Sequence, residues 1–582
     1  KKLTDIGADY FGWGDSGKTV TWSIGSTFYS MPVDSLSFEE IDKEKSEGTE
    51  DDSYDEEEPT PLLEEAPFIQ AIEVIVEKKR YSPKGKIVLR GGRAITMDGN
   101  RIIENSDIVI RNNKILKIGN KGTTIIPENA KVINVSGMTI IPGFIDTHSH
   151  HDEDLVIEPG ASAAISQGIT TIVRGMDGFQ RLPYKTQSAS GLDETGFISL
   201  ARYSNFFDSH PIAINVASFS AHNSIRSQVM GKDYKREASE DEITRMQDLV
   251  ALDMQAGAYG LSTGLEYDPG IYSSTKEVIA LAKVAANYGG KYKSHIRSED
   301  RYYWQAVNEI IEIGKQAQIP VNIDHWKMGA KFLWGKASQV IEILDTARAQ
   351  GIEITADVYP YVAWSSSITT LFPDRNFDDL NEAEFILENL ASAEDIRFVH
   401  HSLHPEYVGK TVEEIAKDAG VENEVMLCRL ASDSYLNEAL SENVVAKGMI
   451  DSDVRILMNW PYANVTSDGA LECSHPRGCG SFPRVLGRYL GKDGIDSLEK
   501  AVYKMTGLSA AQIGIKNRGI IKPGAFADLV LFDPVNIMDQ ATYEDPQKRS
   551  RGIHSVWING KRVLDQGKPT GVLPGKVLLK NQ

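Results

Sequence analysis

The sequence predicts an α/β protein built on a (β/α)₈ barrel of the TIM type, with a small β-domain formed by its two flanking segments and a short N-terminal β-meander. Between about residues 139 and 514, short apolar strands alternate with amphipathic stretches at 274–288, 306–316 and 336–350. Eight strands alternating with helices over more than about 300 residues is typical of this barrel. The expected strands are residues 139–145, 170–174, 212–218, 259–262, 291–295, 320–324, 353–358 and 464–466. Residues 366–450, between the seventh and eighth strands, are too long for one crossover and predict an insertion with helices of its own.

Both sides of the barrel region are rich in β-prone runs separated by turns. Residues 86–94, 107–118 and 130–135 precede it, and residues 527–532, 555–563 and 577–579 follow it. We therefore expect residues 67–138 and 515–582 to build one small β-domain from both flanks.

The first 66 residues differ from the rest of the chain. In residues 1–36, short β-prone runs alternate with Gly and Asp-Ser-Gly turns, which indicates a β-meander. Around residues 13–17 and 22–29 this segment resembles a blade of a TolB-type β-propeller. One blade cannot bury its own faces, so either further blades precede it or it is an isolated meander. Residues 37–66 contain fourteen acids against two lysines, which predicts a solvated acidic linker or, as an alternative, a segment that binds cations or basic partners.

Composition excludes several classes of protein. The 582 residues are 41% hydrophobic and 25% charged, which excludes a wholly disordered, collagenous or coiled-coil chain. No apolar run is long enough to span a membrane, and with a net charge of −20 nothing suggests nucleic-acid binding. Three cysteines cannot make a disulfide framework. We expect a soluble protein, with the compartment open between cytoplasm and periplasm or export.

Polar residues follow the predicted strand ends. The first barrel strand leads into His148 and His150, whose side chains point the same way because positions i and i+2 of a strand share a face. Other strand ends carry Asp177, His295, His325 and Asp468. Since the carboxyl ends of barrel strands converge on one face, these imidazoles and carboxylates predict a site for Zn²⁺ or a similar divalent ion.

The same stretches carry a family resemblance. GMTIIPGFIDTHSHHD (137–152) resembles the opening motif of the amidohydrolase superfamily. ISQGITTIVRGMDG (165–178), VNIDHWK (321–327), TSDG (466–469) and HPRGCGSFPRVLGRY (475–489) resemble one branch, the N-acyl-D-amino-acid deacylases (D-aminoacylases). The similarity runs from about residue 86 to 571, interrupted chiefly by 366–450. It implies zinc-dependent hydrolysis of the amide of an N-acyl-D-amino acid to a carboxylate and a D-amino acid.

The resemblance also implies roles for individual residues. His295 and His325 would hold a tight zinc together with a bridging residue after the second strand, and His148 and His150 would line a second, weaker metal position. Asp468 would be the catalytic general acid and base beside the metals. The residues implied for the substrate pocket are Lys327, Tyr359 and Arg477, which would bind the substrate carboxylate, and Tyr267 and Ser365 nearby.

The bridging position departs from the family pattern. The family often has Cys in an Asn-Cys-Gly motif, where this chain has Met176-Asp177-Gly178. A carboxylate is a harder donor than a thiolate but can bridge two ions through its two oxygens. We therefore predict that Asp177 is a metal ligand and shifts preference toward Mn²⁺ or Co²⁺; the alternative is that it only closes a turn before Gly178.

Two other functions stay open at this stage. One is a related amidohydrolase that acts on a cyclic amide or a dipeptide, and the other is a non-catalytic binding protein on a degenerate barrel. Either enzyme would take a small-molecule substrate, and the oligomeric state is open. Three further groups are interpreted as structural rather than metal-binding: His222, the histidines His400, His401 and His404, and the pocket-loop residues Cys473 and Cys479, without a metal-site partner.

Overall fold

A computed structural model describes residues 9–24, 27–35, 70–73, 85–180, 199–437, 440–491 and 494–580. The chain divides into two compact units, residues 1–80 and residues 81–582. The predicted acidic linker lies outside the described residues. No helix in the described ranges is long and apolar enough to cross a membrane.

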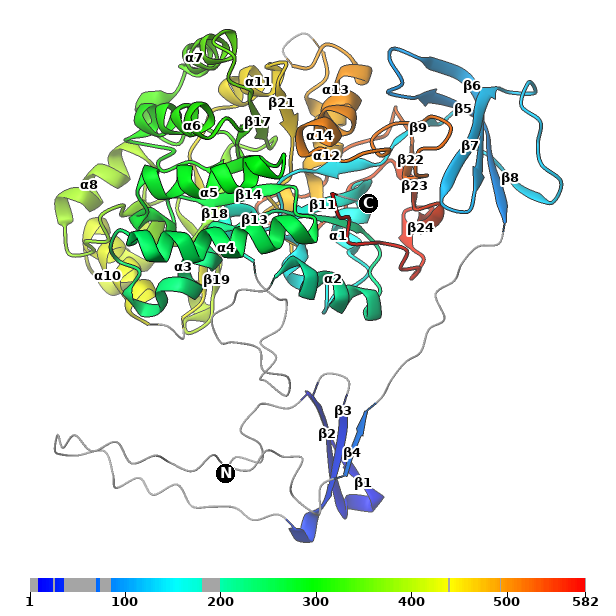
Figure 1. Ribbon diagram of the computed structural model, residues 1–582. Coiled ribbons are helices and arrows are strands. Elements are labelled where there is room, and N and C mark those ends of the chain that lie inside the picture. Colours follow the sequence, from blue (N-terminus) through cyan, green and yellow to red (C-terminus); the bar gives the residue numbers. More distant parts are fainter. Residues whose placement is uncertain are drawn as a thin grey trace. The chain divides into compact units, whose positions relative to one another are not determined.

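The N-terminal unit contains a four-stranded antiparallel sheet in the order β1 (Asp9–Gly14), β2 (Thr19–Ile24), β3 (Thr27–Pro32) and β4 (Gln70–Glu73) (Figure 1). Val20 and Trp22 of β2 face Met31 and Tyr29 of β3, and the Trp22 and Tyr29 rings stack at 5.6 Å. This is the expected meander, with one correction. Residues 70–73 were expected in the β-domain, but they pair with the otherwise open edge of β3.

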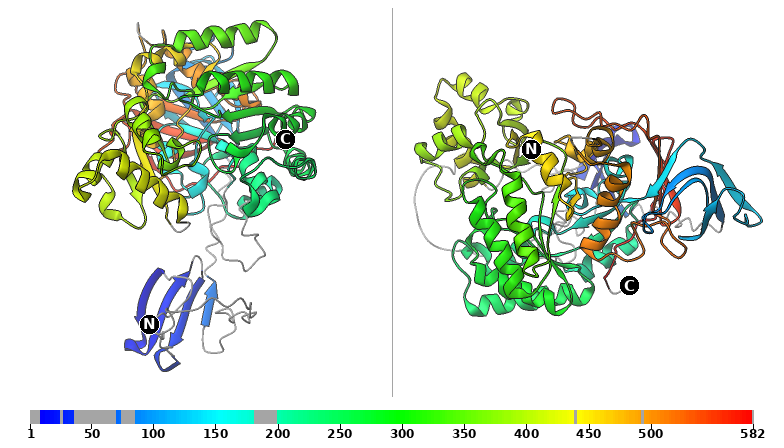
Figure 2. Two further views of the ribbon diagram at one scale, coloured as in Figure 1. Left: turned by 90° about the vertical axis from the view of Figure 1, so that its left-hand side faces the viewer. Right: turned by 90° about the horizontal axis from the view of Figure 1, so that it is seen from above.

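The second unit contains the barrel (Figures 1 and 2). Its parallel strands are β10 (Phe144–Asp146), β11 (Ile169–Arg174), β12 (Asn215–Ser218), β13 (Ser220–Ala221), β14 (Gly260–Gly264), β15 (Lys291–His295), β16 (Val321–Ile323), β17 (Ile354–Val358) and β21 (Ala463–Val465). β12 and β13 are two parts of one barrel strand, interrupted at Phe219. Beyond β21, the Thr466 hydroxyl donates to the His148 carbonyl at 2.6 Å, which links the last strand to the first. Seven of the eight predicted strand positions are therefore confirmed, with ends shifted by up to three residues, whereas the predicted first strand, residues 139–145, enters the barrel only from residue 144.

Helices surround these strands, and the green helices of residues 240–350 lie along their outer side (Figure 2). The predicted helical stretches correspond to α5 (Thr275–Asn287), α6 (Tyr303–Ala317) and α7 (Ala337–Ala349). The other helices of the barrel region are α1 (Ser162–Ser166), α2 (Leu200–Ser209), α3 (His222–Met230), α4 (Glu240–Ala256), α11 (Asp451–Asn459), α12 (Arg477–Arg488), α13 (Leu498–Met505) and α14 (Gly507–Ile513).

Both flanking segments build one nine-stranded sheet, as predicted. Its strands are β5 (Lys86–Ile95), β6 (Ile102–Arg111), β7 (Lys114–Asn120), β8 (Ala130–Asn134), β9 (Thr139–Pro142), β22 (Leu529–Phe532), β23 (Ile553–Ile558), β24 (Lys561–Asp565) and β25 (Lys568–Pro569).

One prediction is wrong in detail: residues 139–145 are not a single barrel strand. The chain changes sheets at Gly143, where β9 ends against β22 and β10 begins against β11. A side chain at Gly143 would collide with Thr170, because a Cβ there would lie 2.2 Å from the Thr170 hydroxyl.

The insertion carries its own helices, α8 (Leu380–Asn389), α9 (Val412–Ala419) and α10 (Asn423–Leu436). It also contributes to an antiparallel sheet in the order β18 (Ala363–Ser366), β20 (Glu442–Lys447) and β19 (Arg397–His401). This sheet lies over the carboxyl ends of the barrel strands, where Trp364, Ser365, Phe398 and Asn443 line a cavity together with barrel residues.

Candidate metal centre and active site

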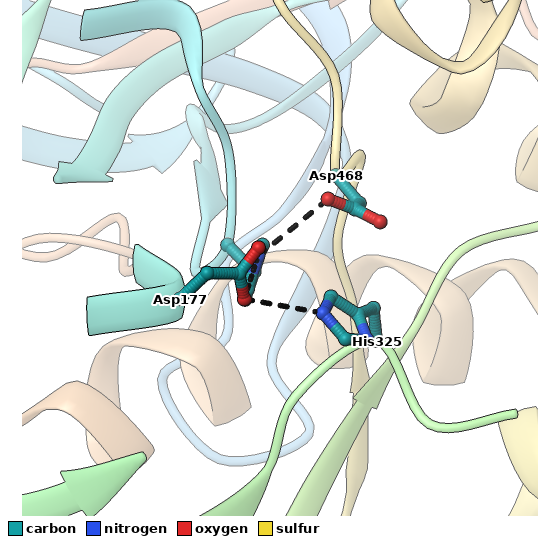
Figure 3. Close-up of side chains that lie close together, drawn as sticks. Asp177, His325 and Asp468 are labelled. Carbon is teal, nitrogen blue, oxygen red and sulfur yellow. Dashed lines mark hydrogen bonds and ion pairs between the residues drawn. The ribbon is translucent and has the colours of Figure 1, made fainter. Parts of the chain in front are cut away.

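The six predicted ligands converge at the carboxyl end of the barrel. His148 and His150 follow β10, Asp177 follows β11, His295 ends β15, and His325 and Asp468 follow β16 and β21. Asp468 is placed by its own backbone N–H, which donates to the His148 carbonyl at 2.9 Å. In Figure 3, the side chains of Asp177, His325 and Asp468 point toward one another from three separate elements.

The distances between the donor atoms fit a divalent metal ion. Asp177 Oδ1 lies 3.3 Å from His325 Nε2 and 3.4 Å from His148 Nε2, and Asp468 Oδ1 lies 3.5 Å from His148 Nε2. A tetrahedral ion with bonds of about 2.0–2.1 Å holds its ligand atoms about 3.3–3.4 Å apart. Among the described residues, neither ring nitrogen of the fully buried His148 has a hydrogen-bond partner. A buried, unsatisfied imidazole surrounded by carboxylates is the donor set that such an ion requires.

Asp177 faces two groups of imidazoles. Its Oδ1 points to His325 and His148, while its Oδ2 lies 3.4 Å from His150 Nε2. His295 Nδ1 lies 3.0 Å from His325 Nε2 and 3.9 Å from Asp177 Oδ1. The carboxylate thus lies between the two metal positions that the resemblance implies.

The charges of the site keep its carboxylates ionised. Burial disfavours charge on Asp177, but the surrounding imidazoles of His148, His150 and His325 outweigh burial and hold its pKa well below the usual range. Burial likewise opposes ionisation of Asp468, and Arg477 is the main group that outweighs it and holds that pKa well below the usual range. Arg477 Nη1 lies 2.7 Å from Asp468 Oδ2. Both aspartates are therefore available as anionic ligands at neutral pH.

Three of these residues have left-handed backbone conformations. The φ angles are 53° at Asp177, 34° at His325 and 50° at Asp468. For a residue with a Cβ this conformation costs about 1–2 kcal/mol, and such residues gather at functional sites. Gly264 of β14 makes room for the first of these turns, because a Cβ there would lie 2.2 Å from the Asp177 carbonyl oxygen.

The structure adds acidic residues that the sequence analysis did not single out. Glu299 lies 3.1 Å from His325 Nδ1 and accepts from Lys327 Nζ with both oxygens at 2.6 Å. Glu266 Oε2 lies 2.8 Å from His295 Nε2, and Asp324 Oδ2 lies 3.3 Å from His148 Nδ1. Glu266 and Glu299 contact His295 and His325 in the way that outer partners of metal ligands do, whereas Asp324 lies close to His148 without a hydrogen bond to it. Glu299 and Asp324 lie within a few residues of His295 and His325 in the sequence. This proximity is a signal from which their place beside the metal ligands could have been predicted.

The predicted substrate residues lie around a cavity of about 1400 Å³. Lys327, Arg477, Tyr267 and Ser365 line it. Tyr359 is buried behind them, with its ring 5.8 Å from Lys327 Nζ and 5.0 Å from the Arg477 guanidinium, and its hydroxyl has no partner among the described residues. The Ser365 hydroxyl donates to Oδ1 of Asn443, another residue of the cavity lining, at 2.6 Å, while the Ser365 carbonyl accepts from Arg477 Nη2.

The other histidines lie outside the close groups of metal-ligand atoms found in the described residues. The buried His222 Nε2 lies 2.8 Å from Glu277 Oε1. His401 Nδ1 accepts from the backbone N–H of His404, and His400 lies on β19 at the cavity wall.

One cysteine prediction is wrong. Cys473 and Cys479 belong to the loop beside the pocket, but they are not plain loop residues because they form a disulfide with each other, with a Cα–Cα distance of 5.8 Å. The turn around His475 and Pro476 brings them together, which their spacing in the sequence does not show.

A parallel barrel with a His-X-His pair after its first strand, further histidines after later strands and an aspartate after its last defines the class as a metal-dependent hydrolase. The family model that matches is the Amidohydrolase family, over residues 131–338 and 457–564. The D-aminoacylase of Alcaligenes xylosoxydans xylosoxydans is 33% identical over 504 residues, covering 85% of this chain and 97% of that protein. The N-acyl-D-glutamate deacylase of the same organism is 34% identical, covering 85% and 96%.

A solved structure gives the same result. The N-acyl-D-glutamate deacylase of Bordetella bronchiseptica, crystallised with zinc and a phosphonate inhibitor that mimics the tetrahedral reaction intermediate, has 32% identity and a TM-score of 0.74. The match covers 85% of this chain and 100% of that one. The chain therefore belongs to the D-aminoacylase branch of the amidohydrolase family.

Proposed function

We propose that the protein is a metal-dependent hydrolase that converts an N-acyl-D-amino acid into a carboxylate and a free D-amino acid. The observation that carries this proposal is that four imidazoles and two carboxylates converge beside a cavity that two cations, Lys327 and Arg477, also line. The relatives named D-aminoacylase and N-acyl-D-glutamate deacylase support the substrate class.

The ligand set would hold one ion tightly and a second more weakly, with Asp177 between them. A bound divalent ion supplies hydroxide at neutral pH and polarises the scissile carbonyl. His295 and His325 are oriented by Glu266 and Glu299. The second position is more exposed on one side, because the His150 side chain is 27% exposed whereas those of His295 and His325 are 3% and 2% exposed.

Asp468 is the residue that moves the proton. Its Oδ1 faces the imidazoles and its Oδ2 contacts Arg477, so the carboxylate is fixed at both oxygens. Because it is ionised at neutral pH, it can accept a proton from the attacking water and then donate it to the departing nitrogen. An amine leaves readily only when it is protonated, so both roles fall to the same carboxylate.

Lys327, Arg477 and Tyr359 would hold the carboxylate of the amino-acid part. Both cations lie close to the Tyr359 ring, at 5.8 Å and 5.0 Å, and the Tyr359 hydroxyl, which has no hydrogen-bond partner in the described part of the chain, can donate. Arg477 can bind a carboxylate through two parallel N–H groups. Anchoring the carboxylate places the amide beside the metal ligands. With both groups fixed, the side chain of a D substrate and that of an L substrate would point in different directions, so the cavity wall can distinguish them.

The test is hydrolysis of paired N-acetyl-D- and N-acetyl-L-amino acids by the purified protein, together with its metal content. We expect zinc or another divalent ion in the protein, turnover of the D substrates, and loss of turnover after treatment with a chelator. Asp468→Asn keeps an amide oxygen in place of the carboxylate, so it should retain the metal held by His295 and His325, but it should lose activity by at least about 100-fold because an amide cannot accept the proton. Hydrolysis of a hydantoin instead of the N-acyl-D-amino acids, or equal turnover of both enantiomers, would contradict the proposal.

A further inference from the structure

A disulfide closes the loop that carries the proposed carboxylate-binding arginine. Cys473 lines the cavity, and Cys479 lies in the first turn of α12. Both are buried, with exposures of 2% and 3%. The five residues between them include His475 and Arg477, which is the first residue of α12.

The closed loop holds Arg477 through several contacts. Its backbone N–H donates to His475 Nδ1 at 3.0 Å, its Nη1 lies 2.7 Å from Asp468 Oδ2, and its Nη2 donates to the Ser365 carbonyl at 3.3 Å. The segment that carries Asp468 packs directly on this loop, since a Cβ at Gly469 would lie 2.4 Å from the Cα of Gly478. Gly478 in turn lies against Cys473, whose Sγ would be 3.3 Å from a Cβ at Gly478.

The third cysteine offers an internal comparison. Cys428 is free, buried and located in α10 of the insertion, and it does not line the cavity. An effect of thiol chemistry on the active site can therefore be traced to the Cys473–Cys479 pair.

We propose that the Cys473–Cys479 disulfide is a positioning element: it fixes Arg477 toward the substrate carboxylate, so that substrate affinity depends on the oxidation state of the pair. This inference rests on the proposed function. Reduction by a dithiol transfers two electrons and two protons, breaks the S–S bond and leaves two thiols, while the dithiol becomes a cyclic disulfide. The freed loop samples more conformations, and Arg477 must then be ordered at the moment of binding.

The expected effect is mainly on KM. Reduction should raise KM for an N-acyl-D-amino acid by about tenfold, because a charge-assisted contact to the carboxylate is no longer preorganised. The value of kcat should fall by a smaller factor: Asp468 loses part of its contact with Arg477, but its backbone N–H still donates to the His148 carbonyl and keeps the carboxylate beside the imidazoles. The preference for the acid over the corresponding D-amino-acid amide, which lacks the carboxylate, should fall by a similar factor.

The experiment compares three zinc-loaded proteins before and after treatment with dithiothreitol: the wild type, Cys428→Ala, and the double variant Cys473→Ser/Cys479→Ser. Alkylation under denaturing conditions should count one free thiol in the untreated wild type and three after reduction. We expect dithiothreitol to raise KM in the wild type and in Cys428→Ala, with recovery on reoxidation. The double variant should have the high KM from the start and should not respond. Metal content and melting temperature, measured on the same samples, separate loss of positioning from loss of zinc or of fold.

Several results would overturn the inference. One is three free thiols in the untreated protein; another is an unchanged KM and unchanged acid-to-amide preference in a fully reduced wild type that retains its zinc. If the oxidised, zinc-loaded wild type hydrolyses no N-acyl-D-amino acid, the proposed function fails and this inference fails with it. If it hydrolyses them but is indifferent to reduction, only this inference fails.

Discussion

At the scale of single residues, Asp177 is where this chain departs most clearly from the family pattern. A thiolate at that position offers one soft sulfur, whereas Asp177 offers two hard oxygens that face different imidazoles. Burial raises the pKa of Asp177, but the neighbouring His148 outweighs burial and holds that pKa well below the usual range. The side chain is therefore anionic before any metal binds. The backbone is left-handed there, at φ 53°, and the carboxylate faces the imidazoles, which favours the ligand role over one of only closing a turn.

We predict that Asp177→Ala abolishes tight metal binding, whereas Asp177→Cys retains zinc and shifts preference away from Mn²⁺ and Co²⁺. Loss of an outer partner typically costs about 10–100-fold in metal affinity, and loss of a direct ligand should cost at least that. Competition titrations with a chromogenic chelator, followed by metal analysis, measure both effects. Glu544→Gln, which changes an exposed acid at the cavity wall, is the matched control and should bind metal like the wild type. An alanine variant with normal metal affinity would exclude Asp177 as a ligand.

At the scale of elements, the strands were predictable because fully buried parallel strands are short continuous apolar runs with polar residues at their ends. The ligand positions followed from the same pattern. The break at Gly143 was not predictable, because it depends on the close approach of Thr170 from another strand. Neither was the insertion sheet, in which Ser365 of β18 pairs with Val445 of β20 far along the chain. The outer carboxylate Glu266 meets His295 for the same reason: its element is placed by tertiary packing, not by local sequence.

Helix α13 contains a buried lysine that ties three elements together. Lys504 Nζ donates to the carbonyls of Trp460, after α11, at 2.7 Å and of Ala463, in β21, at 2.8 Å. Burial lowers the pKa of Lys504 to about 7, and nearby Lys500 adds to this. An unfolded lysine keeps its proton to about pH 10.4, so between pH 7 and 10 the unfolded chain binds more protons than the folded one.

The stability of the wild type should therefore rise with pH across that window relative to Lys504→Met. The expected difference in slope is at most about 1.4 kcal/mol per pH unit, the value for one proton. Melting temperatures of both proteins, measured at intervals from pH 6 to pH 10, test this prediction. Below pH 7 both states of the wild type are protonated, so the difference between the two proteins should be constant there. If the melting temperatures of the two proteins change in parallel from pH 7 to pH 10, the pKa of Lys504 is not lowered in the folded protein.

At the scale of the whole second unit, the cavity is assembled from three parts of the chain. The barrel supplies the metal ligands, the insertion supplies a wall with Trp364 and Asn443, and residues 543–547 of the C-terminal flank complete the rim. The Gln547 side chain donates to the Glu472 carbonyl at 2.9 Å and fixes that rim to the loop after β21. Because the insertion and the C-terminal flank line the cavity away from the proposed metal ligands, we expect these added parts to influence which substrate side chain is accepted.

The charges of this cavity predict a preference for neutral side chains. Its buried or half-buried cations already have carboxylate partners: Lys327 contacts Glu299, Arg477 contacts Asp468, and Arg375 contacts Asp268 at 2.8 Å. The first two would bind the α-carboxylate of the substrate, and Arg397, the remaining lysine or arginine in the described lining, is exposed.

A second carboxylate, on the side chain of N-acyl-D-glutamate or N-acyl-D-aspartate, would therefore lose water without gaining a free cation. We expect kcat/KM for N-acetyl-D-methionine to exceed that for N-acetyl-D-glutamate by at least about tenfold, chiefly through KM. Because exposed charges are screened by salt, the ratio should persist at 0.5 M NaCl if the unpaired buried carboxylate is its cause, and should shrink if the exposed acids of the rim are responsible. Equal or better turnover of the D-glutamate substrate would mean that one of the three paired cations leaves its partner to bind the side chain.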